Sequence, residues 1–501
     1  MAHGALPDLN KLRWQRQLLF DKEGDVEDPR GEEAKSWVDK GLAKATDDPI
    51  VPGFFPLIIN NLVVYRSYYD VRAVYFRDAK DKMGIVVAKA GSIAWKSTDF
   101  DGALANLLAD SKSKPTLDSW LTRYYSNAGF RSLVYENTFN GTLSSDRRNV
   151  YAIDDLSVPA PVDQLQPYTW SSGSISHEVK PLVLQNTLFA INSLYGKLAW
   201  RLGGSVGDPF ANSHFLGVPI AVGDKLYVLN EKNSGPTGDS ELRLLCLDPF
   251  KLASLPAGPA VPTVLKPIMS LGTVRQQERV THDARRRLNA AHLAYGEGVL
   301  VCPTHAGTVF GVDPANQRLL WTYSYREMAP QPDPKKLQWP VPLPVTHWKA
   351  CAPVLHDGKV VFTAPDDASL HCLNLASGKL LWKAPPQGDI YVAGVFNDKV
   401  LLVGKAGCRA LGLADGKQLW ALATGIPSGM GAGNNETFFL PLKKGAESGL
   451  PEVCAIDLVQ GKIAGRVETR DGNFPGNLLF QNDNVFSQTA TGLTAYPRKE
   501  K

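Results

Sequence analysis

The sequence predicts an all-β fold, an eight-bladed β-propeller of four-stranded antiparallel blades. Three observations predict it: segments ending in tryptophan recur along the chain, strand pairs with tight polar turns precede them, and the period is that of one blade. The segments HCLNLASGKLLW and RALGLADGKQLW end at Trp382 and Trp420, which lie 38 positions apart. A four-stranded unit of about 40 residues has the length of a propeller blade.

Each complete repeat joins four strands. Strands A and B pair around a hairpin-type turn, as at Asp357-Gly358 and Asn397-Asp398, and strand C leads through a tight turn to strand D with its tryptophan. We expect these tryptophans to dock neighbouring blades, because an indole supplies a large flat apolar surface and glycine adopts the turn conformation that other residues avoid. The expected docking residues are Trp14, Trp95, Trp200, Trp321, Trp382, Trp420, Gly196, Gly378 and Gly416.

Counting the repeats assigns residues 1–501 to a single propeller domain. The blades are expected near 55–98, 130–202, 212–270, 289–326, 349–385, 389–424, 427–469 and 472–497. The last blade has three strands and lacks a fourth. The segment KLRWQRQLLF, near residues 11–20, contains Trp14 and has no blade of its own, so we predict that it completes the eighth blade and removes an unpaired edge.

Two segments interrupt the repeats. Residues near 100–130 carry apolar side chains at helical spacing, with Thr116 as the expected cap, and predict a short helical insert. Residues 328–348 are rich in proline and predict a stiff, extended loop.

Composition excludes several classes of function. The formal net charge is +4 over 501 residues and the basic residues are scattered, which does not suit nucleic-acid binding. No apolar run approaches the roughly 18 residues that a membrane-spanning helix needs. Residues 1–10 lack the basic start and apolar stretch of a signal peptide, so we expect either a cytosolic chain or one whose leader was removed.

The repeats resemble the PQQ-like repeat, named after the cofactor pyrroloquinoline quinone. Its pattern AxDxxTGKxxW is followed from Cys372 to Trp382 and again from Ala190 to Trp200. Stretches such as GVLVCPTHAGTVFGVD and DIYVAGVFNDKVLLVG look like uncharacterised propeller domains of large exported proteins from planctomycete-type bacteria. The resemblance implies one module of a longer chain in the periplasm or another extracytoplasmic location.

PQQ-like propellers include quinoprotein dehydrogenases and binding propellers such as the outer-membrane assembly lipoprotein, so the repeat alone does not choose a function. In the family, a dehydrogenase needs Ca²⁺ or a similar cation, an aspartate base and usually two adjacent cysteines. This sequence has no adjacent cysteines and no CxxCH haem motif, whereas scattered oxygen ligands stay open. We expect a non-enzymatic scaffold for protein–protein interaction without a cofactor. The alternatives are a PQQ-dependent dehydrogenase and a polysaccharide-binding protein.

Other chemical motifs are weak. Cys302 and His305 have the spacing of two metal ligands, but a further pair is missing, so we interpret them as a strand cysteine and a turn histidine. His282, Asp283 and His214 have no nucleophile setting beside them. The glycine-rich SGMGAGNN precedes no helix and is interpreted as packing, and the six cysteines are expected to be reduced and buried.

Strand alternation places the A–B and C–D turns on one face of the ring and the B–C and D–A connections on the other. The long segments are 100–130, 272–288, 327–348, 155–180, 231–240 and 442–452. All are B–C or D–A connections, so we predict that every large insertion lies on one face, where a protein partner or another domain of the parent chain binds. Arginine and tryptophan are enriched at interface hot spots, and the candidate contacts are Arg285, Arg286, Arg287, Trp339 and Trp348.

Overall fold

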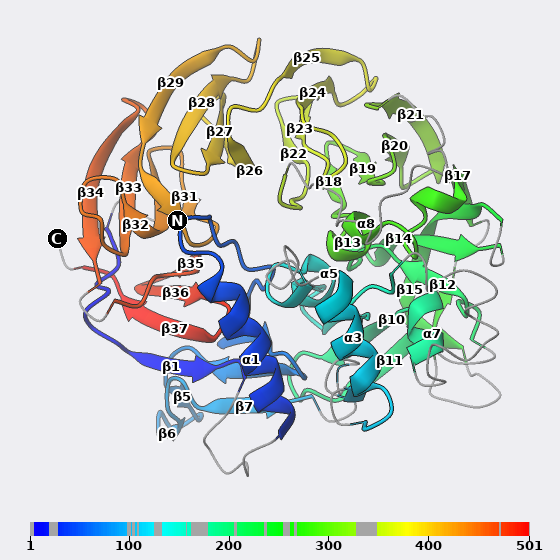
Figure 1. The fold of residues 1–501 in the computed structure, drawn as a ribbon, viewed down its shortest axis with the longest axis horizontal. Helices are drawn as coiled ribbons and strands as arrows, with labels where there is room; N and C mark the ends of the chain where they lie inside the picture. The colour runs from blue at the N-terminus through cyan, green and yellow to red at the C-terminus, as the bar shows by residue number, and fades with distance from the viewer. Residues whose placement is uncertain are drawn as a thin grey trace.

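Short apolar strands joined by tight turns build a ring of eight antiparallel blades in the computed structural model (Figure 1). The structure describes residues 5–19, 29–97, 102, 106–107, 110–124, 133–156, 158–161, 179–204, 208–234, 238–253, 261–264, 268–326, 348–469 and 472–499, with backbone only at 29–34. The prediction of an eight-bladed propeller is confirmed.

The first four blades contain the following strands in chain order. Blade 1 comprises β2 (Leu57–Ile59), β3 (Leu62–Arg66), β4 (Val71–Tyr75) and β7 (Ile93–Lys96). Blade 2 comprises β8 (Leu143–Ser145), β9 (Asn149–Asp154), β10 (Thr187–Asn192) and β11 (Leu198–Gly203). Blade 3 comprises β12 (Ser213–Phe215), β13 (Ile220–Val222), β14 (Lys225–Asn233), β15 (Ser240–Ala253), β16 (Val261–Val264) and β17 (Met269–Val274). Blade 4 comprises β18 (Ala294–Gly296), β19 (Val299–Pro303), β20 (Thr308–Asp313) and β21 (Arg318–Ser324).

The other four blades complete the ring. Blade 5 comprises β22 (Val354–His356), β23 (Lys359–Phe362), β24 (Leu370–Asn374) and β25 (Leu380–Ala384). Blade 6 comprises β26 (Asp389–Phe396), β27 (Lys399–Gly404), β28 (Gly407–Gly412) and β29 (Gln418–Ala423). Blade 7 comprises β30 (Gly425–Pro427), β31 (Ala432–Gly433), β32 (Thr437–Gly445), β33 (Glu452–Asp457) and β34 (Lys462–Glu468). Blade 8 comprises β35 (Asn477–Gln481), β36 (Asn484–Gln488), β37 (Gly492–Pro497) and the N-terminal β1 (Trp14–Gln17).

The N-terminal strand closes the ring. β1 pairs antiparallel with β37, with Trp14 opposite Ala495. The ladder extends on both sides, because Leu18 N donates to Thr491 O (2.9 Å) and Asp8 N donates to Pro497 O (2.8 Å). β1 therefore occupies the D-strand position that the rest of blade 8 lacks.

Five D-strand tryptophans pack beneath glycine turns of the next blade, whereas Trp200 packs against Tyr151 of its own blade. A Cβ added at Gly196 would lie 2.6 Å from the Trp95 ring. The same relation holds for Trp321 with Gly378, Trp382 with Gly416, Trp420 with Gly461 and Trp14 with Gly91. All five glycines have positive φ, between 65° and 83°. These turns need glycine for two reasons: only glycine readily adopts the positive φ, and a Cβ would collide with the indole ring.

Helices occupy the connections on one face. They are α1 (Pro29–Ala43), α3 (Lys114–Tyr124), α5 (Thr138–Gly141), α7 (Val179–Leu184), α8 (Ala284–Leu288) and the 3₁₀ turn η2 (Gln276–Glu278). α3 lies in the predicted helical insert but begins at Lys114, so Thr116 sits within its first turn and is not the cap. Among the described helices, none has the length and apolarity needed to cross a bilayer.

Two hairpins contradict the prediction that every large insertion lies on one face. In blade 1, the C–D connection contains β5 (Ala79–Lys80) and β6 (Val86–Ala88), which pair only with each other. Strand C of blade 1 is β4, and the apolar segment GIVVA after it forms part of the added hairpin. In blade 3, β15 continues past the blade and pairs with β16. Apolar strand patterns outside the blades explain why the repeat count missed both extensions.

Candidate functional site

The connection between blades 3 and 4, on the B–C and D–A face, carries a dense polar network. α8 begins after Asp283, whose Oδ1 accepts a hydrogen bond from Arg285 N (2.9 Å). The helix places Arg285, Arg286 and Arg287 at successive positions, about 100° apart around the helix axis. Their side chains therefore reach three different environments.

Arg286 is buried inside the fold. Its Nη1 lies 2.7 Å from Oε2 of Glu231 on β14, and the two side chains are 3% and 0% exposed. Nη1 also donates to Glu278 O (2.6 Å), and the other Glu231 oxygen accepts from Val280 N (3.0 Å). The ion pair thus fastens the connection to the B strand of blade 3.

Arg287 makes a second buried ion pair, with Asp155 at the end of β9. Nε and Nη2 donate to the two carboxylate oxygens at 3.1 and 2.7 Å, and Nη1 donates to Val183 O (2.8 Å). Burial raises the pKa of Asp155, and the bidentate guanidinium opposes that rise. The arginine therefore joins blade 2, α7 and the blade 3–4 connection.

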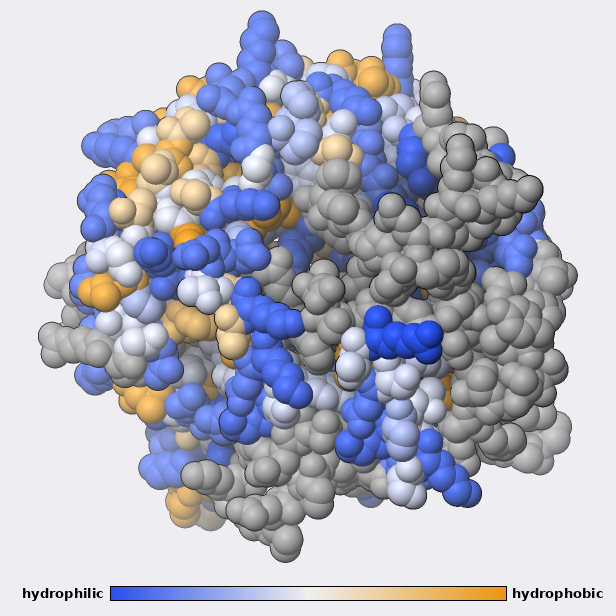
Figure 2. Space-filling model, in the orientation of Figure 1, coloured by the Kyte–Doolittle hydropathy of each residue, from blue (hydrophilic) through white to orange (hydrophobic). Residues whose placement is uncertain are grey.

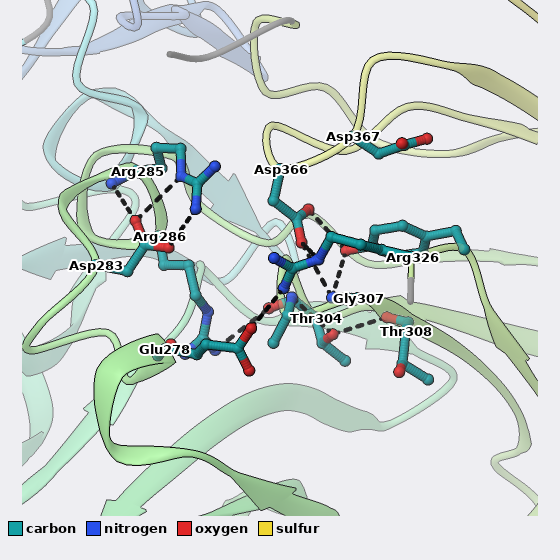
Figure 3. Close-up of polar contacts among 12 residues, drawn as sticks. Glu278, Asp283, Arg285, Arg286, Thr304, Gly307, Thr308, Arg326, Asp366 and Asp367 are labelled. Atoms are coloured by element: carbon teal, nitrogen blue, oxygen red, sulfur yellow. Dashed lines mark hydrogen bonds and ion pairs between the residues drawn. The ribbon is translucent and has the colours of Figure 1, made fainter. Parts of the chain in front are cut away.

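Arg285 and Arg326 lie nearer the surface, each with a side chain 22% exposed (Figure 3). Arg285 pairs with Asp283 (2.9 Å), and Arg326 contacts both Glu278 (3.0 Å) and Asp366 (3.2 Å). Asp366 also accepts hydrogen bonds from Gly307 N (3.0 Å) and Tyr325 Oη (2.8 Å). This second half of the network links blades 4 and 5.

The buried histidines near this network are held neutral. Burial lowers the pKa of His305 to about 4, and Nδ1 of this ring lies 3.1 Å from Asn289 O. Burial also lowers the pKa of His214, and the positive charges of Arg287 and Arg286 lower it further. Burial raises the pKa of the Cys302 thiol. Within the described ranges, no group of three or more His, Cys, Asp or Glu side chains is placed to bind a metal ion.

The predicted contact residues separate into different environments. Arg286 and Arg287 are buried, and Trp348 is 1% exposed with Nε1 donating to Ala368 O (2.9 Å). A partner that docks on the surface does not reach these three side chains, which departs from their predicted contact role. Arg285 stays partly accessible, and Trp339 lies outside the described residues.

Sequence reasoning missed the acidic partners. Glu231 lies in β14 and Asp155 directly follows β9, both outside any motif. Asp155 is 132 positions from Arg287, so no local spacing connects the two. The buried position of both arginines depends on these distant carboxylates.

The mouth of the central channel is crossed by residues 45–56. Ile50 N donates to Pro427 O in blade 7 (3.0 Å), and Asn477 Nδ2 in blade 8 donates to Pro52 O (2.8 Å). Figure 1 shows α5 near the middle of the ring, and Asn137, which caps it, contacts the position of a Gly53 Cβ. The crossing segment therefore contacts the inner strands of blades 7 and 8 and the connection before blade 2.

An ion pair spans the same region. Glu136, before blade 2, lies 2.6 Å from Lys349 Nζ, before blade 5, and Lys349 N donates to Ile390 O in blade 6 (2.8 Å). The other Glu136 oxygen accepts from Val51 N (3.4 Å). Blades 2 and 5 are three positions apart in the ring, so this contact occupies the space near its axis.

The described atoms of this face are largely hydrophilic, with hydrophobic side chains gathered mainly over blades 6 and 7 at the left of the view (Figure 2). The charged groups of the network are neutralised by one another inside the fold. Chemically, the face offers a polar surface with two partly exposed guanidinium groups. Two histidines near it lie beside hydroxyl groups: Thr281 Oγ1 is 2.8 Å from His282 Nδ1, and Tyr323 Oη is 3.2 Å from His371 Nδ1.

The chain folds as an eight-bladed β-propeller, and part of it is similar to a family of PQQ-like repeats. A family model described as outer membrane protein assembly factor BamB matches residues 306–463. No curated protein matches the sequence.

Two solved structures with low sequence identity are similar to this chain. BamB from Moraxella catarrhalis is 13% identical, with a TM-score of 0.46 over 90% of this chain and 96% of that chain. A europium-containing methanol dehydrogenase is 11% identical, with a TM-score of 0.50 over 98% of this chain and 95% of that chain. At such identities the likeness concerns the fold alone, and closeness to planctomycete-type domains stays a prediction.

Proposed function

We propose that this chain is a non-enzymatic scaffold that binds a protein partner on its B–C and D–A face. The observation that carries the proposal is the internal pairing of this face's charges, with Arg286 on Glu231 and Arg287 on Asp155. These pairs hold the loops in place without supplying a reactive group. Elaborated loops on a rigid scaffold are where binding sites concentrate.

The partial match to an assembly-factor family supports binding to other proteins in an extracytoplasmic compartment. We propose further that the propeller is one module of a larger exported protein. The partner is then either a separate protein or another domain of the same parent chain. Arg285 is the candidate contact whose side chain the structure leaves partly accessible.

The quinoprotein alternative requires a cation site near the quinone, and two described carboxylates on inner segments of the ring are already bound to basic side chains. Glu136 is bound by Lys349 and by Val51 N, and Asp389, on an inner strand, is bound by Arg409 at 2.6 Å. A carboxylate that already neutralises a buried base is a poor ligand for Ca²⁺, because binding would leave the base unpaired.

Reconstitution with PQQ and Ca²⁺ tests the choice between scaffold and enzyme. The purified chain is expected to show no quinone absorbance after desalting and no dye-linked oxidation of alcohols or sugars. Stoichiometric quinone retained after desalting contradicts the scaffold proposal. Glu136→Gln serves as the control: if quinone is retained and this variant loses it, the axis region is the cofactor site.

A further inference from the structure

The face opposite the polar network carries exposed apolar side chains on three successive blades. They belong to the hairpin at 78–90 in blade 1, the turn at 193–197 in blade 2 and the extended hairpin of β15 and β16 in blade 3. We call this the blade 1–3 turn surface, and its exposed apolar residues are Met83, Ile85, Val86, Val87, Leu194, Tyr195, Phe250 and Leu252. All three elements are C–D connections, so the strand order places them on the same face.

The exposure is greatest at the tip of the blade 1 hairpin. Met83, Ile85 and Val87 are 81%, 58% and 64% exposed, and Tyr195 in the next turn is 68% exposed. Figure 1 shows β5 and β6 at the rim, beside β1 and β7. Apolar side chains concentrated on protruding turns indicate an interaction surface more strongly than scattered ones do.

The tips are shaped by their own hydrogen bonds. Asp81 Oδ1 accepts from Met83 N and Ile85 N, each at 2.9 Å, and Gly84 has a φ of 81°. Asp248 Oδ1 accepts from Phe250 N (3.1 Å) in the blade 3 hairpin. These two tips are therefore held by local hydrogen bonds, and Phe250 also packs against Arg148 of blade 2, whose guanidinium lies 5.3 Å from the ring centre. The exposed apolar side chains lie outside the blade cores.

Acidic and basic groups of this surface differ in their surroundings. Its carboxylates point back into the turns: Asp78 accepts from Lys89 Nζ (3.1 Å) and Ala90 N (2.9 Å), and Asp146 accepts from Tyr151 Oη (2.9 Å). Four exposed lysines beside the apolar tips form no salt bridge within the described part of the chain. They are Lys80, Lys82, Lys197 and Lys251.

We propose that the blade 1–3 turn surface docks on an anionic lipid bilayer. Apolar tips enter the boundary between headgroups and acyl chains, while lysine side chains extend to the phosphates, because amphipathic stems keep their ammonium groups in the polar layer. Tyr195 suits the same boundary, where aromatic residues with a polar end are enriched. Lysine is depleted at protein–protein interfaces, which favours a lipid partner for this surface.

Sedimentation with vesicles tests the proposal on the full chain. Binding is expected to vesicles of phosphatidylcholine mixed with phosphatidylglycerol, to weaken at high salt, and to be far weaker with phosphatidylcholine alone. The double variant Lys80→Glu/Lys82→Glu is expected to lower the partition coefficient roughly 30-fold or more. Ile85→Asp/Val87→Asp is expected to lower it at least as much, because it places charge in the apolar boundary.

Two control variants carry matched changes on the opposite face. Lys444 is exposed near the B–C end of blade 7 and Leu450 is 47% exposed in the following connection, so Lys444→Glu and Leu450→Asp are expected to bind vesicles like the parent. Unchanged melting of all four variants shows that the fold persists. Equal binding to neutral vesicles, equal binding by the tip variants, or capture of a soluble protein through the tip without vesicle binding overturns the proposal.

Discussion

A D-strand tryptophan and a turn glycine of the following blade form one packing unit. In three of these units the indole Nε1 also donates to a carbonyl of the next blade's turn, as Trp95 does to Ser193 O (3.0 Å), Trp321 to Leu375 O (2.8 Å) and Trp382 to Leu413 O (2.9 Å). The hydrogen bond holds the edge of the indole ring in place, and the glycine leaves room for the face of the ring because it has no Cβ. Each of these tryptophans thus buries its apolar ring and also gives its indole N–H a hydrogen-bond acceptor.

Two glycine-to-alanine substitutions distinguish the free energy lost through backbone strain from that lost through the contact with tryptophan. Gly378 and Gly358 have nearly equal φ, 66° and 65°, but a Cβ at Gly378 would lie 2.5 Å from Trp321, whereas a Cβ at Gly358 would meet open space. Gly358→Ala is expected to lower the free energy of unfolding by about 1 kcal/mol. Gly378→Ala is expected to cost a further ~1–3 kcal/mol through overpacking. Denaturant titration measures both, and equal losses would show that the indole adapts freely.

Buried histidines make stability depend on pH. The folded state lowers the pKa of His305 from 6.5 to about 4, so between these values the unfolded chain binds more protons than the folded chain. Stability is therefore expected to fall as the pH falls through this window. Denaturant midpoints measured across it should fall less steeply in His305→Asn, since asparagine tolerates the φ of 55° at this position. His356→Asn, at a side chain 43% exposed, is the control and should keep the parent's slope.

Among the secondary-structure elements, β1 is one that the sequence pattern predicts correctly. The period of the repeats and an unassigned tryptophan segment pointed to Trp14, and the pairing of β1 with β37 provides the missing D strand. The same reasoning did not find the burial of Arg286 and Arg287, because their partners Glu231 and Asp155 come from other blades. It also missed the hairpin of β5 and β6, whose apolar strand pattern looks like an ordinary blade strand. Patterns within a repeat were readable, whereas contacts between repeats required the structure.

Removing residues 1–20 is expected to destabilise the whole ring. The deletion leaves β37 with an unpaired edge and removes Trp14, which is 8% exposed and packs against Gly91. Thermal unfolding should show a lower midpoint or aggregation of the truncated chain. Gln15→Ala changes an exposed side chain of the same strand and should melt like the parent. A truncated chain that melts like the parent would mean that β1 contributes little to ring closure.

At the scale of the molecule, the two faces differ in chemistry. The B–C and D–A face holds its charges in internal pairs, while the C–D face over blades 1–3 exposes lysines beside apolar tips. Ion pairs link blades 2 to 5, and residues 45–56 contact blades 7 and 8, so we expect the proposed scaffold to keep these two faces apart. A scaffold of this kind can hold one partner on each side without coupling the two binding events.

Trimming one face at a time tests this independence. Replacing 329–345 by a short Gly-Ser link is expected to abolish capture of the protein partner without unfolding the propeller, since elaborated loops on a rigid ring carry the contacts. Replacing 79–88 by a short turn is the reciprocal variant, expected to keep partner capture and lose vesicle binding. Both variants are tested by pull-down of the protein partner and by vesicle sedimentation, so each binding activity is measured after each deletion. Unchanged capture after trimming 329–345 would rule out that segment as the contact surface, and loss of both activities in either variant would show that the faces are coupled.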